Sequence, residues 1–245
     1  YPLPKGATEQ LFMERELSSV ISLLHENREG MEFSYPHRLL GLLLGEYEGK
    51  EQRVRAVEEL QKAVAAPGGD SFTYYDLGLT LGRLSRYDEA IAAFQTSIRM
   101  NKAFKQSYLA LGLMYFDNKN YEDSAQVLER YVRFADDNAE YPGLKTLGRS
   151  CFKLGRLHCA EDAFKRAEFI ADDDKKQGEA AYYLGNTYFE EGRLEEGAEA
   201  YGRALDRDAS YKKVFLNLNK MLSFKKEHRK AAAIEGILKR ERKKD

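Results

Sequence analysis

The chain has 245 residues, and its 39 Lys and Arg residues nearly balance 40 Asp and Glu residues, giving a formal net charge of −1. This balance excludes a strong overall attraction to nucleic acid or anionic membranes, and no apolar stretch approaches the roughly 18 residues that a membrane-spanning helix needs. With 32% charged residues, 5 Pro and no Trp, the composition is typical of a soluble helical protein.

The N-terminal segment, residues 1–33, precedes any repeat and contains an amphipathic stripe. Within residues 8–27, apolar side chains follow helical spacing at Leu11, Phe12, Leu17, Val20, Ile21 and Leu24. The stripe predicts one helix, which either caps the first repeat or folds into the groove that the repeats form. Because the chain begins with Tyr1 rather than Met, its compartment stays open: the cytoplasm is slightly favoured, and export is compatible with the sequence.

From Ser34 onwards the chain repeats itself. A Leu-Gly pair, followed three residues later by Leu, Tyr or Cys, recurs every 34 to 37 residues, and a degenerate copy follows at Leu218-Asn219. The complete pairs are Leu40-Gly41, Leu77-Gly78, Leu111-Gly112, Leu147-Gly148 and Leu184-Gly185. A period near 34 residues is typical of helical solenoids. The predicted units are about 34–70, 71–104, 105–140, 141–177, 178–211 and 212–245.

Residue types occupy fixed positions within each unit. Large residues and the Leu-Gly pair occupy positions 4, 7, 8 and 11 of the unit, which is the spacing of one helix face. Small and mostly aromatic residues at positions 20, 24 and 27 indicate a second helix. The unit from Ser71 shows this in Gly78, Ala90 and Phe94. The pattern resembles the tetratricopeptide repeat family from about Ser34 to the C-terminus. The resemblance implies an all-α fold, a right-handed α-α superhelical solenoid of about six helix-turn-helix units.

The terminal units depart from the pattern. In the first, Arg53 falls where a small residue belongs, and Ala56 follows three residues later, so we expect three extra residues in the turn around Gly49. The sixth lacks the Leu-Gly pair but keeps Ala231 at the small position. Such drift is expected because one face of a terminal unit has no neighbouring repeat.

The 2 cysteines are interpreted as packing groups. Cys151 occupies a core position of the third complete unit's first helix, and Cys159 adjoins the small Ala160 on the second helix. We expect both to be buried, small, apolar side chains. A disulfide across the hairpin is the alternative, and a spacing of eight residues does not by itself make a metal site.

The sequence contains no pattern that predicts catalysis, a cofactor or a metal site. The 4 histidines lie far apart, and the glycines follow the repeat instead of forming a phosphate-binding motif. The acidic run Asp172–Asp174 lacks the glycine-centred loop of a calcium site and is interpreted as a turn between units. The chain is therefore predicted to be non-enzymatic, without a cofactor or a small-molecule substrate.

The family resemblance also implies a partner-binding surface. In tetratricopeptide repeats the first helix of each unit lines a concave groove, with positions 2, 5, 9 and 12 pointing into it. At these positions the chain is apolar and aromatic early and partly cationic later, with Phe72, Tyr75, Leu79, Leu109, Leu113, Phe116, Lys145, Arg149, Tyr182, Asn186, Lys213 and Lys220. Large apolar patches of this kind usually mark partner sites. We expect Tyr75, Phe116 and Tyr182 to be anchors whose rings lie outside the inter-helix core.

The predicted function is that of an adaptor or scaffold that binds a peptide or helix of another protein, with acidic partner residues opposite the cations. Relatives that clamp a C-terminal carboxylate use five polar residues. This chain matches two of them, at Lys145 and Lys213, and departs at Arg149, Tyr183 and Asn217.

Two alternative functions stay open. One is an assembly factor or pilot, exported or lipid-anchored, for a secretion, pilus or envelope complex. The other is association with nucleic acid or an anionic surface through the basic C-terminal tail around Lys239–Lys244. The sequence does not indicate the oligomeric state.

Overall fold

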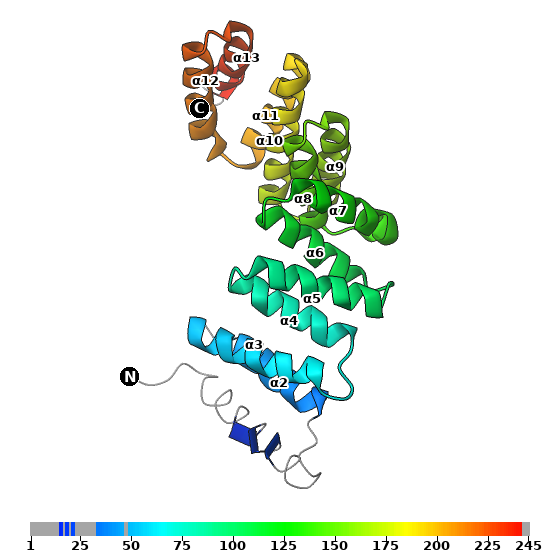
Figure 1. The fold of residues 1–245 in the computed structure, drawn as a ribbon. Helices are drawn as coiled ribbons and strands as arrows, with labels where there is room; N and C mark the ends of the chain where they lie inside the picture. The colour runs from blue at the N-terminus through cyan, green and yellow to red at the C-terminus, as the bar shows by residue number, and fades with distance from the viewer. Residues whose placement is uncertain (1–14, 17, 20, 23–32, 47–48, 242–245) are drawn as a thin grey trace, which may run out of the picture. The chain divides into compact units, whose positions relative to one another are not determined.

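The computed structural model describes residues 15–16, 18–19, 21–22, 33–46 and 49–241. Within these residues the chain forms twelve α-helices and one 3-10 helix, and it contains no strand (Figure 1). The predicted all-α fold of consecutive helix pairs is confirmed. The backbone is divided into two compact units, residues 1–119 and 120–245. The assignment of residues 34–245 to one solenoid stays a prediction.

Each helix of the first compact unit packs against the next one in the chain. The helices are α2 (Ser34–Gly45), α3 (Lys50–Ala65), α4 (Ser71–Arg83), α5 (Tyr87–Met100) and α6 (Lys105–Asp117). Three of them, α2, α4 and α6, begin where the repeat predicts that a unit begins.

The second compact unit continues the pattern of neighbouring helices. Its helices are α7 (Tyr121–Ala135), the 3-10 helix (Asp136–Asn138), α8 (Tyr141–Lys153), α9 (Leu157–Ile170), α10 (Asp174–Glu191), α11 (Leu194–Arg207), α12 (Tyr211–Phe224) and α13 (His228–Glu241). From α7 to α11 each helix packs against its successor, and α11 then contacts both α12 and α13.

The repeated glycines allow a ring of the second helix to lie against the backbone of the first. A Cβ built at Gly78 would lie 2.6 Å from the Phe94 ring, and one at Gly185 would lie 2.5 Å from the Tyr201 ring. Both rings are buried. Because real Cβ atoms do not approach so closely, only glycine fits, and the glycine–ring contact explains the repeat at positions 8 and 24.

A left-handed residue ends the first helix of most pairs. It is Gly155 after α8 and Gly192 after α10, with φ of 70° and 79°, and Ser85 takes the same place after α4 with φ of 58°. The next backbone amide then donates to the carbonyl five residues back, as Arg156 does to Cys151 over 2.9 Å. This hydrogen-bond pattern satisfies carbonyls that the helix end would leave unpaired.

The first helix pair corrects one prediction. The three extra residues do not lengthen the turn, because α3 already begins at Lys50; they add about one turn to the start of that helix instead. Ala56 then occupies the small position and is fully buried. A Cβ at Gly41 would lie 2.6 Å from Leu60, so the glycine contact persists with leucine in place of a ring.

The last helix pair replaces the glycine contact with a hydrogen bond. Asn219 stands where the other units have glycine, and its side-chain amide donates to the backbone carbonyl of Ala231 over 3.0 Å. The residue at the ring position is the exposed Glu235, so no ring needs the space. Ala231 itself is buried, as the sequence predicts.

The predicted N-terminal helix lies largely outside the described residues, including Leu11, Phe12, Leu17, Val20 and Leu24. The six described residues between Arg15 and Ser22 are helical. Ile21 packs against the buried cluster of Leu40, Leu44 and Ala56. This contact supports the capping alternative for the segment.

Candidate functional site

The predicted groove residues lie on the first helices of the repeats, and the faces they form are named the first-helix surfaces. The first compact unit contributes residues of α4 and α6. The second contributes residues of α8, α10 and α12. All of the predicted groove residues lie within the part of the chain that the structure describes.

An aromatic cluster forms the first-helix surface at α4. The centre of the exposed Phe72 ring lies 4.6 Å from the centre of the Phe104 ring. The centre of the Tyr75 ring lies 5.1 Å from the centre of the same Phe104 ring. The Arg38 guanidinium lies 5.8 Å from the Phe72 ring and is ion-paired with Asp76 at 2.6 Å. The structure therefore adds Arg38 and Phe104 to the predicted set. The remaining predicted side chains of this unit are partly buried, namely Leu79, Leu109, Leu113 and Phe116.

One predicted anchor of this cluster is also part of the core. The Tyr75 ring lies 5.9 Å from the ring of Phe94, which is fully buried. The expectation that this ring lies outside the inter-helix core is therefore wrong. Position 5 places this ring against the second helix of the pair, so truncating Tyr75 would remove core packing too.

The first-helix surface at α8 combines a cation with a carboxylate and a phenol. Lys145 pairs with Glu179 of α10 at 3.0 Å, and the Tyr141 hydroxyl donates to the same carboxylate over 3.0 Å. Burial and the neighbouring Glu179 raise the pKa of the Tyr141 phenol well above its usual range. Lys145 is therefore already paired within the chain and does not offer a free charge to a partner.

Stacked rings dominate the neighbouring surface at α10. The Tyr182 ring lies 5.2 Å from Tyr211 and 5.9 Å from the buried Tyr201, so this second predicted anchor is also wrongly placed outside the core. The Arg149 guanidinium lies 5.6 Å from the centre of the Tyr183 ring. Both Tyr182 and Tyr183 remain partly exposed.

Polar contacts fix the edge of this ring surface. The Tyr201 hydroxyl donates to the side-chain oxygen of Asn186 over 2.6 Å. Burial is the main cause that raises the pKa of the Tyr183 phenol, which Arg149 partly counteracts. Lys213 and Lys220 lie on α12, where both side chains are exposed.

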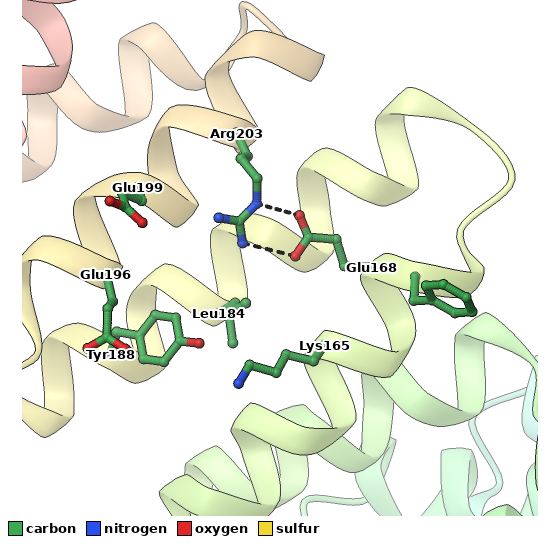
Figure 2. A pocket seen from close by; sticks show the side chains of 8 residues that line it. Lys165, Glu168, Leu184, Tyr188, Glu196, Glu199 and Arg203 are labelled. Carbon is green, nitrogen blue, oxygen red and sulfur yellow. Dashed lines mark hydrogen bonds and ion pairs between the residues drawn. The ribbon is translucent and has the colours of Figure 1, made fainter.

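A cavity of about 480 Å³ lies between α9, α10 and α11 in the second compact unit (Figure 2). Arg203 of α11 reaches across it to Glu168 of α9, with hydrogen bonds of 2.7 and 3.1 Å. Its lining contains no Ser, Thr, Cys or His; it consists of Lys165, Glu168, Phe169, Leu184, Tyr188, Glu196, Glu199 and Arg203. The Arg203–Glu168 ion pair links α9 to α11.

Beside this cavity, Glu161 is held by three donors. Its carboxylate pairs with Arg193 at 2.8 Å and Lys165 at 2.7 Å, and it accepts a hydrogen bond from the Tyr188 hydroxyl over 3.1 Å. Burial alone raises the pKa of the Glu161 carboxyl, but the hydrogen bonds from Arg193, Lys165 and Tyr188 outweigh it and hold the pKa at about 2. The Arg193 guanidinium also lies 4.2 Å from the Tyr188 ring.

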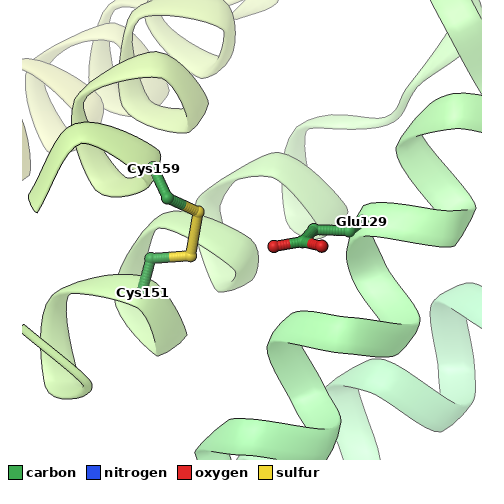
Figure 3. Close-up of side chains that lie close together, drawn as sticks. All are labelled: Glu129, Cys151 and Cys159. Carbon is green, nitrogen blue, oxygen red and sulfur yellow. A yellow bond between two sulfur atoms is a disulfide. The ribbon is translucent and has the colours of Figure 1, made fainter. Parts of the chain in front are cut away.

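The two cysteines form a disulfide, which corrects the expectation of two unlinked side chains. Cys151 of α8 and Cys159 of α9 are bonded, with their Cα atoms 5.8 Å apart (Figure 3). The carboxylate of Glu129, on α7, lies within 4.8 Å of both sulfur atoms. Because the sulfurs are bonded to each other, they do not offer the thiolates that a metal site would need.

Reduction of this disulfide should destabilise the protein. The bridge closes a loop between residues separated by 8 positions, and a loop of this size corresponds to about 2–3 kcal/mol of stabilisation. Urea unfolding with and without dithiothreitol measures the difference. The Cys151→Ala, Cys159→Ala double variant is the control, because the reductant should leave its stability unchanged. Two titratable thiols in the unreduced, unfolded wild-type chain would contradict the bridge.

Comparison with known proteins identifies the repeat. A sequence profile of the tetratricopeptide repeat matches residues 75–139 and 145–212. No curated protein matches the chain.

Several solved structures share the fold. A crystal structure of MamA is 19% identical, with a TM-score of 0.59, and the match covers 67% of this chain and 93% of that one. MamA from residue 41 to its end, from Desulfovibrio magneticus RS-1, is 22% identical, with a TM-score of 0.57 and coverage of 74% and 99%. YrrB, described as a TPR protein with an unusual peptide-binding site, is 20% identical, with a TM-score of 0.59 and coverage of 74% and 91%.

Proposed function

Because the chain belongs to the tetratricopeptide repeat family, we propose that it is a non-enzymatic scaffold whose first-helix surfaces bind a peptide or helix of another protein. The observation that carries this proposal is the arrangement of Tyr182 and Tyr183, which are partly exposed yet packed on buried rings. Tyr182 contacts Tyr201, and Tyr183 stacks on Phe164 at 5.2 Å.

Rings held in this way suit partner binding. A ring already fixed by its neighbours loses little freedom when a partner covers it, so more of the contact energy appears as affinity. Tyrosine and arginine are also the residue types most often found at the centres of protein interfaces. Arg149, beside the Tyr183 ring, adds a cation that can meet a partner carboxylate or carbonyl.

Two further points support a protein partner. YrrB, which shares the fold, is described as having a peptide-binding site. In addition, an Arg203–Glu168 ion pair crosses the cavity, and Lys165 at its edge pairs with Glu161, which favours a bracing role over catalysis.

Affinity capture with the intact chain, followed by titration of the purified partner, tests the proposal. Phe72→Ala changes the first compact unit, and Arg149→Glu changes the second. At least one of the two variants should weaken partner binding by about 30-fold, because truncating an interface anchor costs about 2 kcal/mol.

The controls are Met100→Ala and Lys102→Glu. Met100 is 51% exposed, similar to Phe72 at 45%, but it lies on a second helix, and Lys102 lies in the exposed turn after it. Both controls should bind the partner within about twofold of wild type. Wild-type affinity in both Phe72→Ala and Arg149→Glu, with intact circular dichroism, would overturn the proposed function.

A further inference from the structure

Helix α12 exposes more large apolar side chains than any other helix among the described residues. Four of its large apolar residues are exposed: Val214, Leu216, Met221 and Phe224. Phe224 is 90% exposed and Leu216 is 39% exposed. Its other side is anchored, because Phe215 and Leu222 are buried in the cluster that α12 shares with α11 and α13. The exposed side is therefore held in place without a covering element in the described chain.

All charged residues of α12 are basic. It contains three lysines and no acidic residue, and Lys225 and Lys226 follow directly. Lys213 and Lys220 form no ion pair within the described part of the chain, in contrast to Lys145, which pairs with Glu179. A charged surface of this kind attracts segments of opposite charge.

The apolar and basic residues fall into one row. Leu216, Lys220 and Phe224 are spaced i, i+4, i+8, which places them on one helix face, and Lys213 adjoins the row one turn earlier. Leu216 and Phe224 are therefore about 12 Å apart along the helix, with a cation between them. We name the four residues the α12 surface. Lys213 and Lys220 also belong to the predicted groove residues.

We propose that the α12 surface binds an acidic amphipathic helix of another protein. In this arrangement two apolar side chains of the partner cover Leu216 and Phe224, and its carboxylates meet Lys213 and Lys220. The inference rests on the proposed function, and it names the chemistry of the partner at the C-terminal end of the repeats. Two such rows can pack as ridges into grooves, the usual way in which helices associate.

The position of Lys220 favours a protein over a lipid surface. A helix that inserts into a membrane interface gathers its apolar residues on one face and places its cations at the margins of that face. Here the cation lies between the two apolar residues, where it would be carried into the apolar layer. A partner helix with a carboxylate at the matching place neutralises it instead.

Binding of a designed peptide to the full chain tests the inference. The probe is a fluorescein-labelled amphipathic helix with a Leu, Glu, Leu row at i, i+4, i+8, and its Glu→Lys version is the matched negative probe. Anisotropy should show binding of the acidic peptide that weakens between 50 and 300 mM NaCl. The Lys213→Glu, Lys220→Glu double variant and the Phe224→Ala variant should each lose about tenfold or more in affinity.

Phe169→Ala and Lys102→Glu are the matched controls. Phe169 is 89% exposed, almost the same as Phe224, but it lies on α9. Both controls should bind the acidic peptide as wild type does, and circular dichroism should be unchanged in all variants. No measurable binding of the acidic peptide, or equal loss in Phe169→Ala and Phe224→Ala, would overturn the inference.

Two further outcomes would replace the proposed occupant. Cosedimentation with phosphatidylserine vesicles, lost in Phe224→Ala while the peptide does not bind, would assign the surface to anionic lipid. Concentration-dependent dimerisation lost in Phe224→Ala would assign it to a second copy of this chain.

If Phe72→Ala or Arg149→Glu loses the captured partner while the α12 variants bind the peptide normally, only the α12 inference fails. If both Phe72→Ala and Arg149→Glu keep the captured partner, the proposed function fails.

Discussion

Gly148→Leu should lower the free energy of unfolding by about 3 kcal/mol or more, the upper range for overpacked cores. A Cβ at this position would lie 2.5 Å from the Phe164 ring. That ring is fully buried and cannot move aside without disturbing its contact with Tyr183. Because α8 and α9 are also linked by the disulfide, the pair cannot separate freely to make room. Urea unfolding followed by circular dichroism measures the loss.

Gly202→Leu is the matched control for this substitution. Gly202 lies within α11, and a Cβ built there meets no other atom within 4 Å. Leucine should be tolerated or mildly stabilising at this position, because glycine within a helix costs up to about 1 kcal/mol relative to better helix formers. Similar destabilisation of both variants would show that glycine is not required by the contact with Phe164.

The repeats could be predicted from the sequence because most units need a residue without a side chain opposite a large one. Gly78 and Phe94 are 16 residues apart, as are Gly148 and Phe164, so one steric contact imposes the same spacing on successive units. The first pair was predicted less well. Its extra residues could extend either a turn or a helix, and a count of residues does not distinguish between them.

The candidate site was less predictable because its side chains have two roles. Tyr75 and Tyr182 occupy positions that the family pattern directs into the groove, yet their rings also touch buried rings. Position in the repeat gives the direction of a Cα–Cβ bond and does not give the neighbours of a long side chain. Phe104 was missed because it lies in the turn before α6, outside the helical positions that the pattern covers.

The ion pairs between repeats were missed, although a signal for them exists. Lys145 pairs with Glu179, 34 residues away, and Arg203 pairs with Glu168, 35 residues away. Opposite charges one repeat apart therefore mark contacts between adjacent first helices or adjacent second helices. The disulfide gives no comparable signal, because a spacing of eight residues also fits two unlinked core cysteines.

Acid should destabilise the protein in a way that depends on Glu161. The pKa of this carboxyl is about 2 in the folded chain and 4.5 in its unperturbed state. Because the folded value is the lower one, the ionised carboxylate stabilises the fold at pH values above 4.5. This contribution is lost as pH falls from 4.5 through the folded value. The free energy of unfolding, measured in urea from pH 7 to pH 2, should decrease across this window.

Glu161→Gln should flatten this dependence and lower the stability at neutral pH. The amide cannot be ionised, and it leaves Arg193 and Lys165 without the carboxylate that they share. Glu195→Gln is the control, since that side chain is exposed at the start of α11 and should leave the pH profile unchanged. Glu59 and Asp70 also have lowered pKa values, so some loss of stability in acid should persist in Glu161→Gln. A Glu161→Gln profile parallel to that of wild type between pH 4.5 and 2 would show that the bracing of Glu161 by Arg193, Lys165 and Tyr188 does not contribute to folding.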